Sequence, residues 1–213
     1  MLRPDDRAHL LELLRPPAGC RFDRAVGTTF SLDLLSALTV PLSFALFDWE
    51  DVDGRPSSDP LAMLEALRRH GDRFDIFCQA GQISFPRRYP PLVTFLENTV
   101  HEVHAPDEQG VFHPKVWALR FLSHTGEVLY RVLCLSRNLT FDRSWDTVVA
   151  LDGILTDRSR AIAANHPLGD LFEALPGLAM RKLPLDRKKA IQRLAWELRR
   201  TRFEWPEGFN END

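Results

Sequence analysis

The chain has 213 residues, of which 44% are hydrophobic and 27% are charged, and its formal net charge is −3. These values are close to those of an ordinary globular domain with a sizeable core. They exclude an overall basic composition of the kind that marks many nucleic-acid-binding proteins, so any basic contact surface must be local.

Turn residues and hydrophobic periodicity divide the first third of the chain into separate elements. The predicted elements are an amphipathic helix over residues 5–15, an extended segment over 22–30, a buried helix over 34–47, a surface loop over 48–60 and a helix from Pro60 to Gly71. The apolar helix has only fourteen residues and contains Pro41, so we expect it to be buried and to be broken or kinked near the proline.

The rest of the chain alternates between strands and helices. Strands are predicted over 74–78, 101–105 and 147–151, helices over 91–100 and within 158–175 and 186–202, and two apolar strands on either side of a turn at 123–126. This order predicts an α/β protein, specifically an α/β/α sandwich with a mixed central β-sheet. We expect one domain over residues 1–202, followed by an extended tail, or a linker cut short, over 203–213.

Three widely spaced cysteines form no Cys-x-x-Cys motif. We interpret Cys20, Cys78 and Cys134 as reduced core residues, with no disulfide framework and no zinc site. The N-terminus has no apolar signal core. Together these features predict a cytoplasmic protein without membrane contact.

Two short polar motifs stand out on the predicted hairpin. His113 and Lys115 form a His-x-Lys pair, and Ser136 and Asn138 form a Ser-x-Asn pair about twenty residues later. Residues two apart point to the same face of a strand, so two adjacent antiparallel strands bring all four side chains around one point. Each pair alone is common by chance, but the combination predicts a phosphate site.

The residue types of the two motifs suit phosphodiester chemistry. The lysine ammonium and the asparagine amide can hold the non-bridging oxygens without a metal ion, and a neutral imidazole can attack phosphorus to form a phosphohistidine. No set of His, Cys and Asp residues has the spacing of metal ligands, so we expect no metal and no cofactor.

This segment resembles the phospholipase D superfamily, whose half-site motif is His-x-Lys followed by Gly-Ser-x-Asn. It is most similar to the nuclease-like branch, in which the second strand often continues as Ser-x-Asn-Leu-Thr. The chain differs from the motif at two positions: Arg120 stands where an Asp commonly follows the Lys by five residues, and Leu135 replaces the Gly before the Ser. The resemblance covers about forty residues.

The family implies two His-Lys-Asn sets around one phosphate, one histidine as nucleophile and the other as general acid. This chain has one set. The resemblance therefore implies a homodimer, or a second phospholipase D-like half in a longer polypeptide.

A carboxylate is expected to orient the histidine. Asp142, Asp146 and Asp152 all follow Asn138 closely, and we favour Asp146, whose other interpretation is a turn or cap side chain. Trp117 and Trp145 are interpreted as packing residues rather than as base-stacking platforms.

Basic residues concentrate between Arg181 and Arg202, a segment that contains nine Lys or Arg residues and only two acidic residues. An apolar stripe at helical spacing predicts that one face of this helix packs and the other is basic. Its members are Ile191, Leu194, Ala195 and Leu198. The basic face is either solvated or contacts a nucleic-acid backbone, so we name Lys188, Lys189 and also Arg137 as candidate substrate-binding residues.

The sequence thus predicts a metal-independent phosphodiesterase of the phospholipase D type, and specifically a nuclease that acts on DNA. The alternatives are a non-catalytic phospholipase D-like module that binds nucleic acid or a partner, and a lipid-acting phospholipase D-type enzyme. The last has less support, because no amphipathic membrane face stands out.

Overall fold

The structure is a computed structural model, and it describes residues 10–47, 64, 68–88, 91–107, 109–141 and 146–205, without the side chains of residues 11 and 45–47. The loop predicted over 48–60 lies outside the described residues, as do Asp142, Trp145 and residues 206–213. Residues 68–71 are helical, in agreement with the helix predicted to end at Gly71.

A seven-stranded mixed sheet forms the centre of the molecule, in the order β5-β3-β1-β6-β7-β8-β9. Its strands are β1 (Cys20–Thr29), β3 (Phe74–Gln79), β5 (Val100–Val103), β6 (Val116–Ser123), β7 (Val128–Leu135), β8 (Val148–Leu155) and β9 (Thr201–Phe203). The first three pair in parallel, and the pairs from β1–β6 through β8–β9 are antiparallel. The α/β fold with a mixed central sheet is therefore confirmed.

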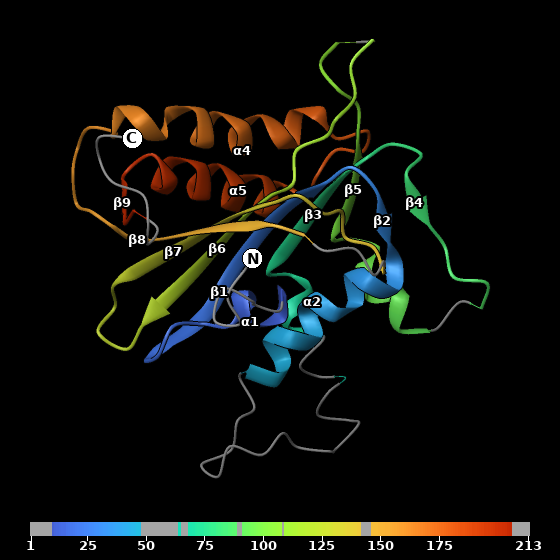
Figure 1. Ribbon diagram of the computed structural model, residues 1–213, viewed down its shortest axis with the longest axis horizontal. Coiled ribbons are helices and arrows are strands. Elements are labelled where there is room, and N and C mark those ends of the chain that lie inside the picture. The colour runs from blue at the N-terminus through green and yellow to red at the C-terminus, as the bar shows by residue number, and fades with distance from the viewer. Residues whose placement is uncertain are drawn as a thin grey trace, which may run out of the picture.

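Helices cover both faces of the sheet (Figure 1). One layer holds α4 (His166–Leu178) and α5 (Leu185–Leu198), and the other holds α1 (Leu10–Leu14) and α2 (Leu34–Phe47). Each layer has its own apolar core, because alternate residues of β6 point to opposite faces: Trp117 and Leu119 join the α2 side, and Ala118 joins the α5 side. The predicted stripe on α5 is buried in the second core.

Several elements differ from the prediction. The helix expected over 91–100 is a short 3-10 helix, η2 (Pro91–Leu96), because Thr99 closes the turn onto the Leu96 carbonyl and β5 begins one residue later. The helix expected over 186–202 ends at Leu198, and the chain then forms the edge strand β9. The last residue of β9, Phe203, belongs to the segment expected to be a tail.

Two further expectations need correction. Helix α2 continues through Pro41 without a break. All three cysteines are free, as expected, but only Cys78 is buried, and Cys134 is exposed. Its neighbours on β7, Leu133 and Leu135, are the residues that point into the α2-side core, so Cys134 points to the opposite face.

Arg120, the residue at the position where the family commonly has Asp, lies in a buried ion network. Its guanidinium donates to Glu197 of α5 at 2.7 Å and to Asp23 at 2.6 Å, and the Tyr130 hydroxyl also donates to Glu197 at 2.6 Å. Burial opposes ionisation of Glu197, but the hydrogen bonds from Arg120, Tyr130 and Arg193 outweigh it and hold the pKa of Glu197 below its ordinary value. Arg120 therefore joins the sheet to α5 and takes no part in the motif.

Candidate active site at the end of strands β6 and β7

The segment that carries His113 and Lys115 precedes β6 and is anchored at both ends. At one end, the backbone N–H of Phe112 donates to Oε1 of Gln79 at 2.6 Å. At the other, the hydroxyl of Thr28 accepts from the N–H of Val116 at 2.9 Å and donates to its carbonyl at 3.0 Å. These two anchors come from the ends of β3 and β1, so neighbouring strands set the position of His113 and Lys115.

The Lys115 ammonium lies against the His113 ring. Its Nζ is 3.1 Å from Nδ1 and 3.1 Å from Nε2. An ammonium equidistant from both nitrogens in the ring plane would collide with the carbon between them, so Lys115 lies above the plane. The in-plane lone pair of the neutral imidazole stays open for attack on an electrophile. Partial burial lowers the pKa of Lys115.

The second motif follows β7 directly and adjoins the first. The backbone N–H of Leu135 donates to the carbonyl of Lys115 at 2.9 Å, which places Ser136 to Asn138 beside the His-x-Lys segment. Oδ1 of Asn138 accepts from the N–H of Phe30 at 3.3 Å. Because the oxygen is engaged in this way, the amide nitrogen of Asn138 remains a donor for a ligand.

Phe30, just after β1, joins the two motifs. Its amide holds Asn138, and its ring centroid is 5.0 Å from that of His113. Its carbonyl lies 3.3 Å from the Cys78 thiol, whose pKa burial raises to about 12, so the thiol stays protonated and donates. Phe30 therefore contacts a side chain of each motif and is itself fixed to β3.

Ser136, Arg137 and Asp146 form a separate cluster at the same end of the sheet. The Ser136 hydroxyl donates to Asp146 Oδ1 at 3.2 Å and accepts from the N–H of Thr147 at 2.9 Å. The guanidinium of Arg137 lies 3.5 Å from Asp146 Oδ2 and donates to the Thr140 carbonyl at 2.7 Å. The single Ser136 proton is thus directed at Asp146, so Ser136 and Arg137 orient this carboxylate.

The structure describes two of the three candidate carboxylates, and of these Asp146 is the one that lies beside the motif residues. Asp152 pairs with Arg131 through two hydrogen bonds of 2.7 and 2.8 Å on β7 and β8. Asp142 lies outside the described residues. That Asp146 orients His113 stays a prediction.

Lys188 and Lys189 are exposed near the start of α5. Their neighbour Arg187 is bound to Asp72 and to the Phe74 carbonyl at the start of β3, whereas Gln79, at the other end of β3, holds the His113 segment. In the described part of the chain, neither lysine side chain bonds to a motif residue, so their predicted contact with substrate lies away from the reacting centre.

Thr28, Phe30 and Gln79 were not foreseen from the sequence. Thr28 and Gln79 are polar residues at the ends of the buried strands β1 and β3, which is a usable signal, whereas Phe30 directly follows β1 and carries no such signal. Across the described ranges, no group of three or more His, Cys, Asp or Glu side chains is placed to hold a metal ion. In the same ranges, no helix is both long and apolar enough to cross a bilayer.

Comparison with known proteins identifies the fold. No family profile matches the sequence, and no curated protein matches it significantly. A mutant of yeast tyrosyl-DNA phosphodiesterase 1 shares the fold with a TM-score of 0.53 and 12% identity over 92% of this chain and 38% of that chain. A second mutant of the yeast enzyme gives a TM-score of 0.50 and 13% identity over 88% and 36%. The chain thus spans less than two fifths of either neighbour.

Proposed function

We propose that this protein is a metal-independent phosphodiesterase of the phospholipase D type that acts on DNA. The observation that carries the proposal is the convergence of His113, Lys115 and Asn138 around Phe30. An open imidazole lone pair, an ammonium and an amide donor are the groups that a phosphodiester needs for attack and for charge stabilisation. The fold that the chain shares with a DNA phosphodiesterase also supports this proposal, although only through the arrangement of its helices and strands.

In the proposed mechanism, a ring nitrogen of His113 attacks phosphorus. The N–P bond forms as the bond to the leaving oxygen breaks, and that oxygen takes a proton from a general acid. Lys115 and Asn138 hold the non-bridging oxygens as their charge increases. Water then attacks phosphorus and gives a proton to the deprotonated general acid, the N–P bond breaks, and both the imidazole and the acid are regenerated.

The general acid has to come from a second motif, because this chain contains one His-x-Lys pair. We infer that a second copy of the chain, or a second half of a longer polypeptide, faces this end of the sheet. Apolar side chains beside the motifs support a covered surface: Val111 is 65% exposed, Phe141 is 69% exposed, and Val149 is 43% exposed. That the chain matches under two fifths of the yeast enzyme agrees with a half-site.

Hydrolysis of bis(p-nitrophenyl) phosphate in excess EDTA tests the proposed activity. We expect turnover to persist in the chelator, because Lys115 and Asn138 supply the charge stabilisation that a divalent ion otherwise provides. Activity that disappears in EDTA and returns with magnesium would overturn the metal-independent mechanism.

Sedimentation equilibrium of the same sample tests the shared site. We expect activity to follow the dimer, and mixing His113→Ala with Lys115→Ala chains to rescue nothing, because each hybrid site is damaged on both sides. A fully active monomer contradicts the shared-site proposal. An inactive monomer favours a half-protein.

A non-catalytic phospholipase D-like module is the second candidate, because a single motif set is incomplete on its own. It predicts nucleic-acid or partner binding without turnover, in the dimer as well as in the monomer.

A further inference from the structure

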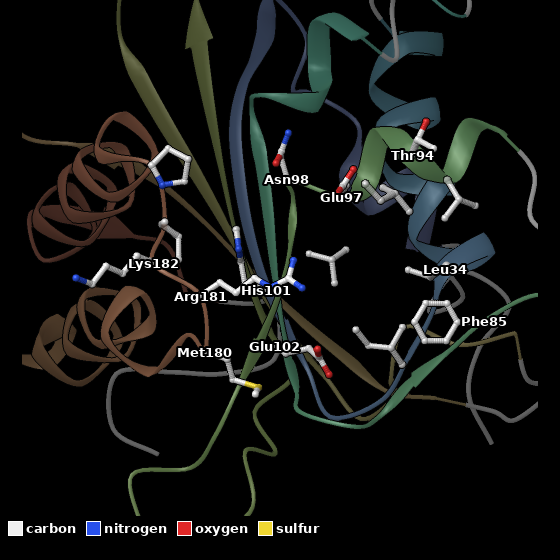
Figure 2. Close-up of a pocket in the computed structure, with 16 residues that line it drawn as sticks. Leu34, Phe85, Thr94, Glu97, Asn98, His101, Glu102, Met180, Arg181 and Lys182 are labelled. Carbon is white, nitrogen blue, oxygen red and sulfur yellow. The ribbon is translucent and has the colours of Figure 1, made fainter.

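A cavity of about 700 Å³ lies along the outer edge of β5, the last strand of the sheet on that side (Figure 2). One wall comes from the segment between α4 and α5. The opposite wall comes from η2, the start of α2 and the short strand β4 (Ile83–Ser84), which pairs with β2 (Leu32–Asp33). None of the motif residues lines the cavity, so it is separate from the proposed reacting centre.

The edge of β5 presents unpaired backbone groups to this cavity. The N–H of Ile76 on β3 donates to the carbonyl of Thr99 at 2.7 Å, so the odd-numbered residues of β5 direct their N–H and C=O groups to β3. The backbone groups of Val100 and Glu102 therefore point away from the sheet. Within the described part of the chain, no protein group bonds to the N–H or C=O of Val100 or to the N–H of Glu102. A strand edge of this kind can pair with an added strand.

The chain itself begins such a pairing and does not continue it. The N–H of Met180, just after α4, donates to the carbonyl of Glu102 at 2.9 Å and forms part of one antiparallel bridge to the end of β5. In the described structure, residues 181–184 form no further bridge to β5 and lead into α5. The position beside Val100 in the sheet is therefore left to the cavity.

The charges in the cavity lining are balanced. Arg181 and Lys182 come from the α4–α5 segment, and Glu97 and Glu102 come from the end of η2 and from β5. Figure 2 shows Arg181 beside His101 on β5, whereas Lys182 is directed away from the strand. A lining with equal numbers of carboxylates and cations does not favour a polyanion. It suits a peptide, which has a neutral backbone and side chains of either kind.

The two faces of β5 give the cavity two different environments. Towards α2 the lining is mainly apolar, with Leu34, Val93 and Leu96, and its rim carries carboxylates that disfavour an acidic ligand group. Towards α5 the lining has His101 and Arg181, and in the described part of the chain Arg181 forms no ion pair. Because alternate side chains of an added strand point to opposite faces, the strand that fits alternates apolar and acidic residues.

Exposed apolar side chains flank the cavity on both sides. Phe85, just after β4, is 67% exposed, and Met180 is 58% exposed. Figure 2 shows the two on opposite sides of β5. Large apolar side chains exposed at the rim of a cavity are typical of contacts with another protein.

Strand β5 is also held firmly in place. The Nε2 of His101 lies 2.8 Å from Oδ1 of the fully buried Asp75, and Arg24 and Arg187 donate to the same carboxylate at 2.9 Å each. The edge is thus formed before any partner binds, which lowers the entropic cost of adding a strand.

We propose that the free edge of β5 binds an extended segment of a partner protein in which apolar and acidic residues alternate. The segment adds a strand beside Val100 and pairs with the free backbone groups of Val100 and Glu102. Its apolar side chains pack on the α2 side of the cavity, and an acidic side chain contacts Arg181. This binding surface is independent of the proposed enzymatic activity.

The test is the fluorescence anisotropy of the labelled synthetic peptide Ser-Glu-Val-Glu-Val-Glu-Ser, titrated with the full-length chain. We expect saturable binding. Only one set of alternate peptide N–H groups faces β5, so N-methylation of either the valines or the glutamates should weaken binding at least about 10-fold, and N-methylation of the other set should have little effect. No saturable binding, or an equal effect of both methylations, overturns the proposed strand pairing.

A matched pair of variants tests the same pairing from the side of the protein. Glu102→Pro removes the free N–H, and a proline is tolerated where the N–H of an edge strand faces outward. Glu102→Thr removes the same carboxylate but keeps the N–H. We expect Glu102→Pro to bind the peptide about 10-fold more weakly than Glu102→Thr does. Equal affinities of the two variants contradict the proposal.

The acidic preference has its own control on the α4–α5 segment. Arg181→Gln should weaken binding of the peptide about 5-fold, whereas Lys182→Gln, which removes the same charge from a side chain directed away from β5, should change it little. The charge-reversed peptide Ser-Lys-Val-Lys-Val-Lys-Ser should bind at least about 10-fold more weakly to the wild-type chain. Equal effects of the two substitutions, or equal binding of the two peptides, overturn the acidic partner.

Sedimentation equilibrium separates a partner protein from a second copy of this chain. An oligomer that dissociates in Glu102→Pro but not in Glu102→Thr would mean that the edge of β5 binds a second copy, and the partner proposal would fail. Loss of peptide binding in Glu102→Pro with an unchanged mass supports a separate partner.

Discussion

Lys115 and Arg120 lie five residues apart on one stretch of chain, and the fold uses their charges in opposite ways. Arg120 is buried in the sheet, where Glu197 and Asp23 neutralise it. Lys115 stands at the open end of β6, and its neighbour there is the imidazole of His113. A cation fully satisfied by carboxylates supports the fold, whereas a cation next to the proposed nucleophile is available for a ligand.

The largest effect that separates the two regions is expected at His113. His113→Ala should reduce hydrolysis by at least about three orders of magnitude, because it removes the proposed nucleophile. Its free energy of unfolding should change little, since the side chain is exposed. His124→Ala, an exposed histidine in the β6–β7 turn, is the matched control. A His113→Ala protein that keeps most of its activity contradicts the site.

The buried network should respond in stability. Glu197→Ala removes one of the two carboxylates that neutralise the buried Arg120 and also the acceptor of the Tyr130 hydroxyl, so the free energy of unfolding in urea should fall by about 3–5 kcal/mol. Arg193→Ala removes an exposed partner of the same carboxylate and should cost no more than about 1 kcal/mol. If both variants lose the same stability, the network is not the structural anchor described above.

A smaller effect is expected at the anchor between β3 and the motif. Gln79→Met removes the acceptor for the Phe112 amide, so His113 should shift and kcat should fall roughly 10- to 100-fold with KM nearly unchanged. Gln79→Glu keeps an acceptor oxygen at that position and should recover much of kcat. Gln82→Met, in the exposed turn after β3, controls for general effects. A parallel change in KM would indicate lost substrate contact instead of lost positioning.

The smallest effect concerns pH. Burial lowers the pKa of Lys115, so its ammonium is lost at a lower pH than that of a free lysine. Activity that needs the charged form should therefore fall as pH rises through this lowered value, below the ordinary lysine pKa of about 10.4. In pH–rate profiles, Lys115→Arg should move the alkaline decline upward in whatever activity it retains. An unchanged alkaline limb would exclude Lys115 as its source.

The sequence predicted those parts of the site that depend on residues close to one another in the chain. Period-two alternation located β6 and β7, helical spacing located the buried stripe of α5, and the two motifs adjoin because their strands are hairpin neighbours. The anchors were not predictable in this way. Gln79 and Phe112 are 33 residues apart, and Thr28 and Val116 are 88 residues apart. Neither contact produces a periodic pattern in the sequence.

Short elements escaped prediction for another reason. Strands β2 and β4 have two residues each, which is too short for any alternation to be seen. The turn at η2 is set by Thr99 bonding back to Leu96 and not by the hydrophobic pattern of residues 91–100. The role of Arg120 depends on Asp23 and Glu197, which lie 97 and 77 residues away.

The hydrogen bond from Phe30 to Asn138 closes a loop of 108 residues, and the one from Leu139 to Thr29 closes a loop of 110. Contacts of such long range form after the local hairpins during folding, because the entropy of loop closure has to be overcome first. A chain still emerging from the ribosome therefore carries His113 and Lys115 before the Phe30–Asn138 contact can form. The arrangement that brings the two motifs together becomes available only once β1 and the end of β7 are held in one sheet, so a partly made chain lacks the proposed site.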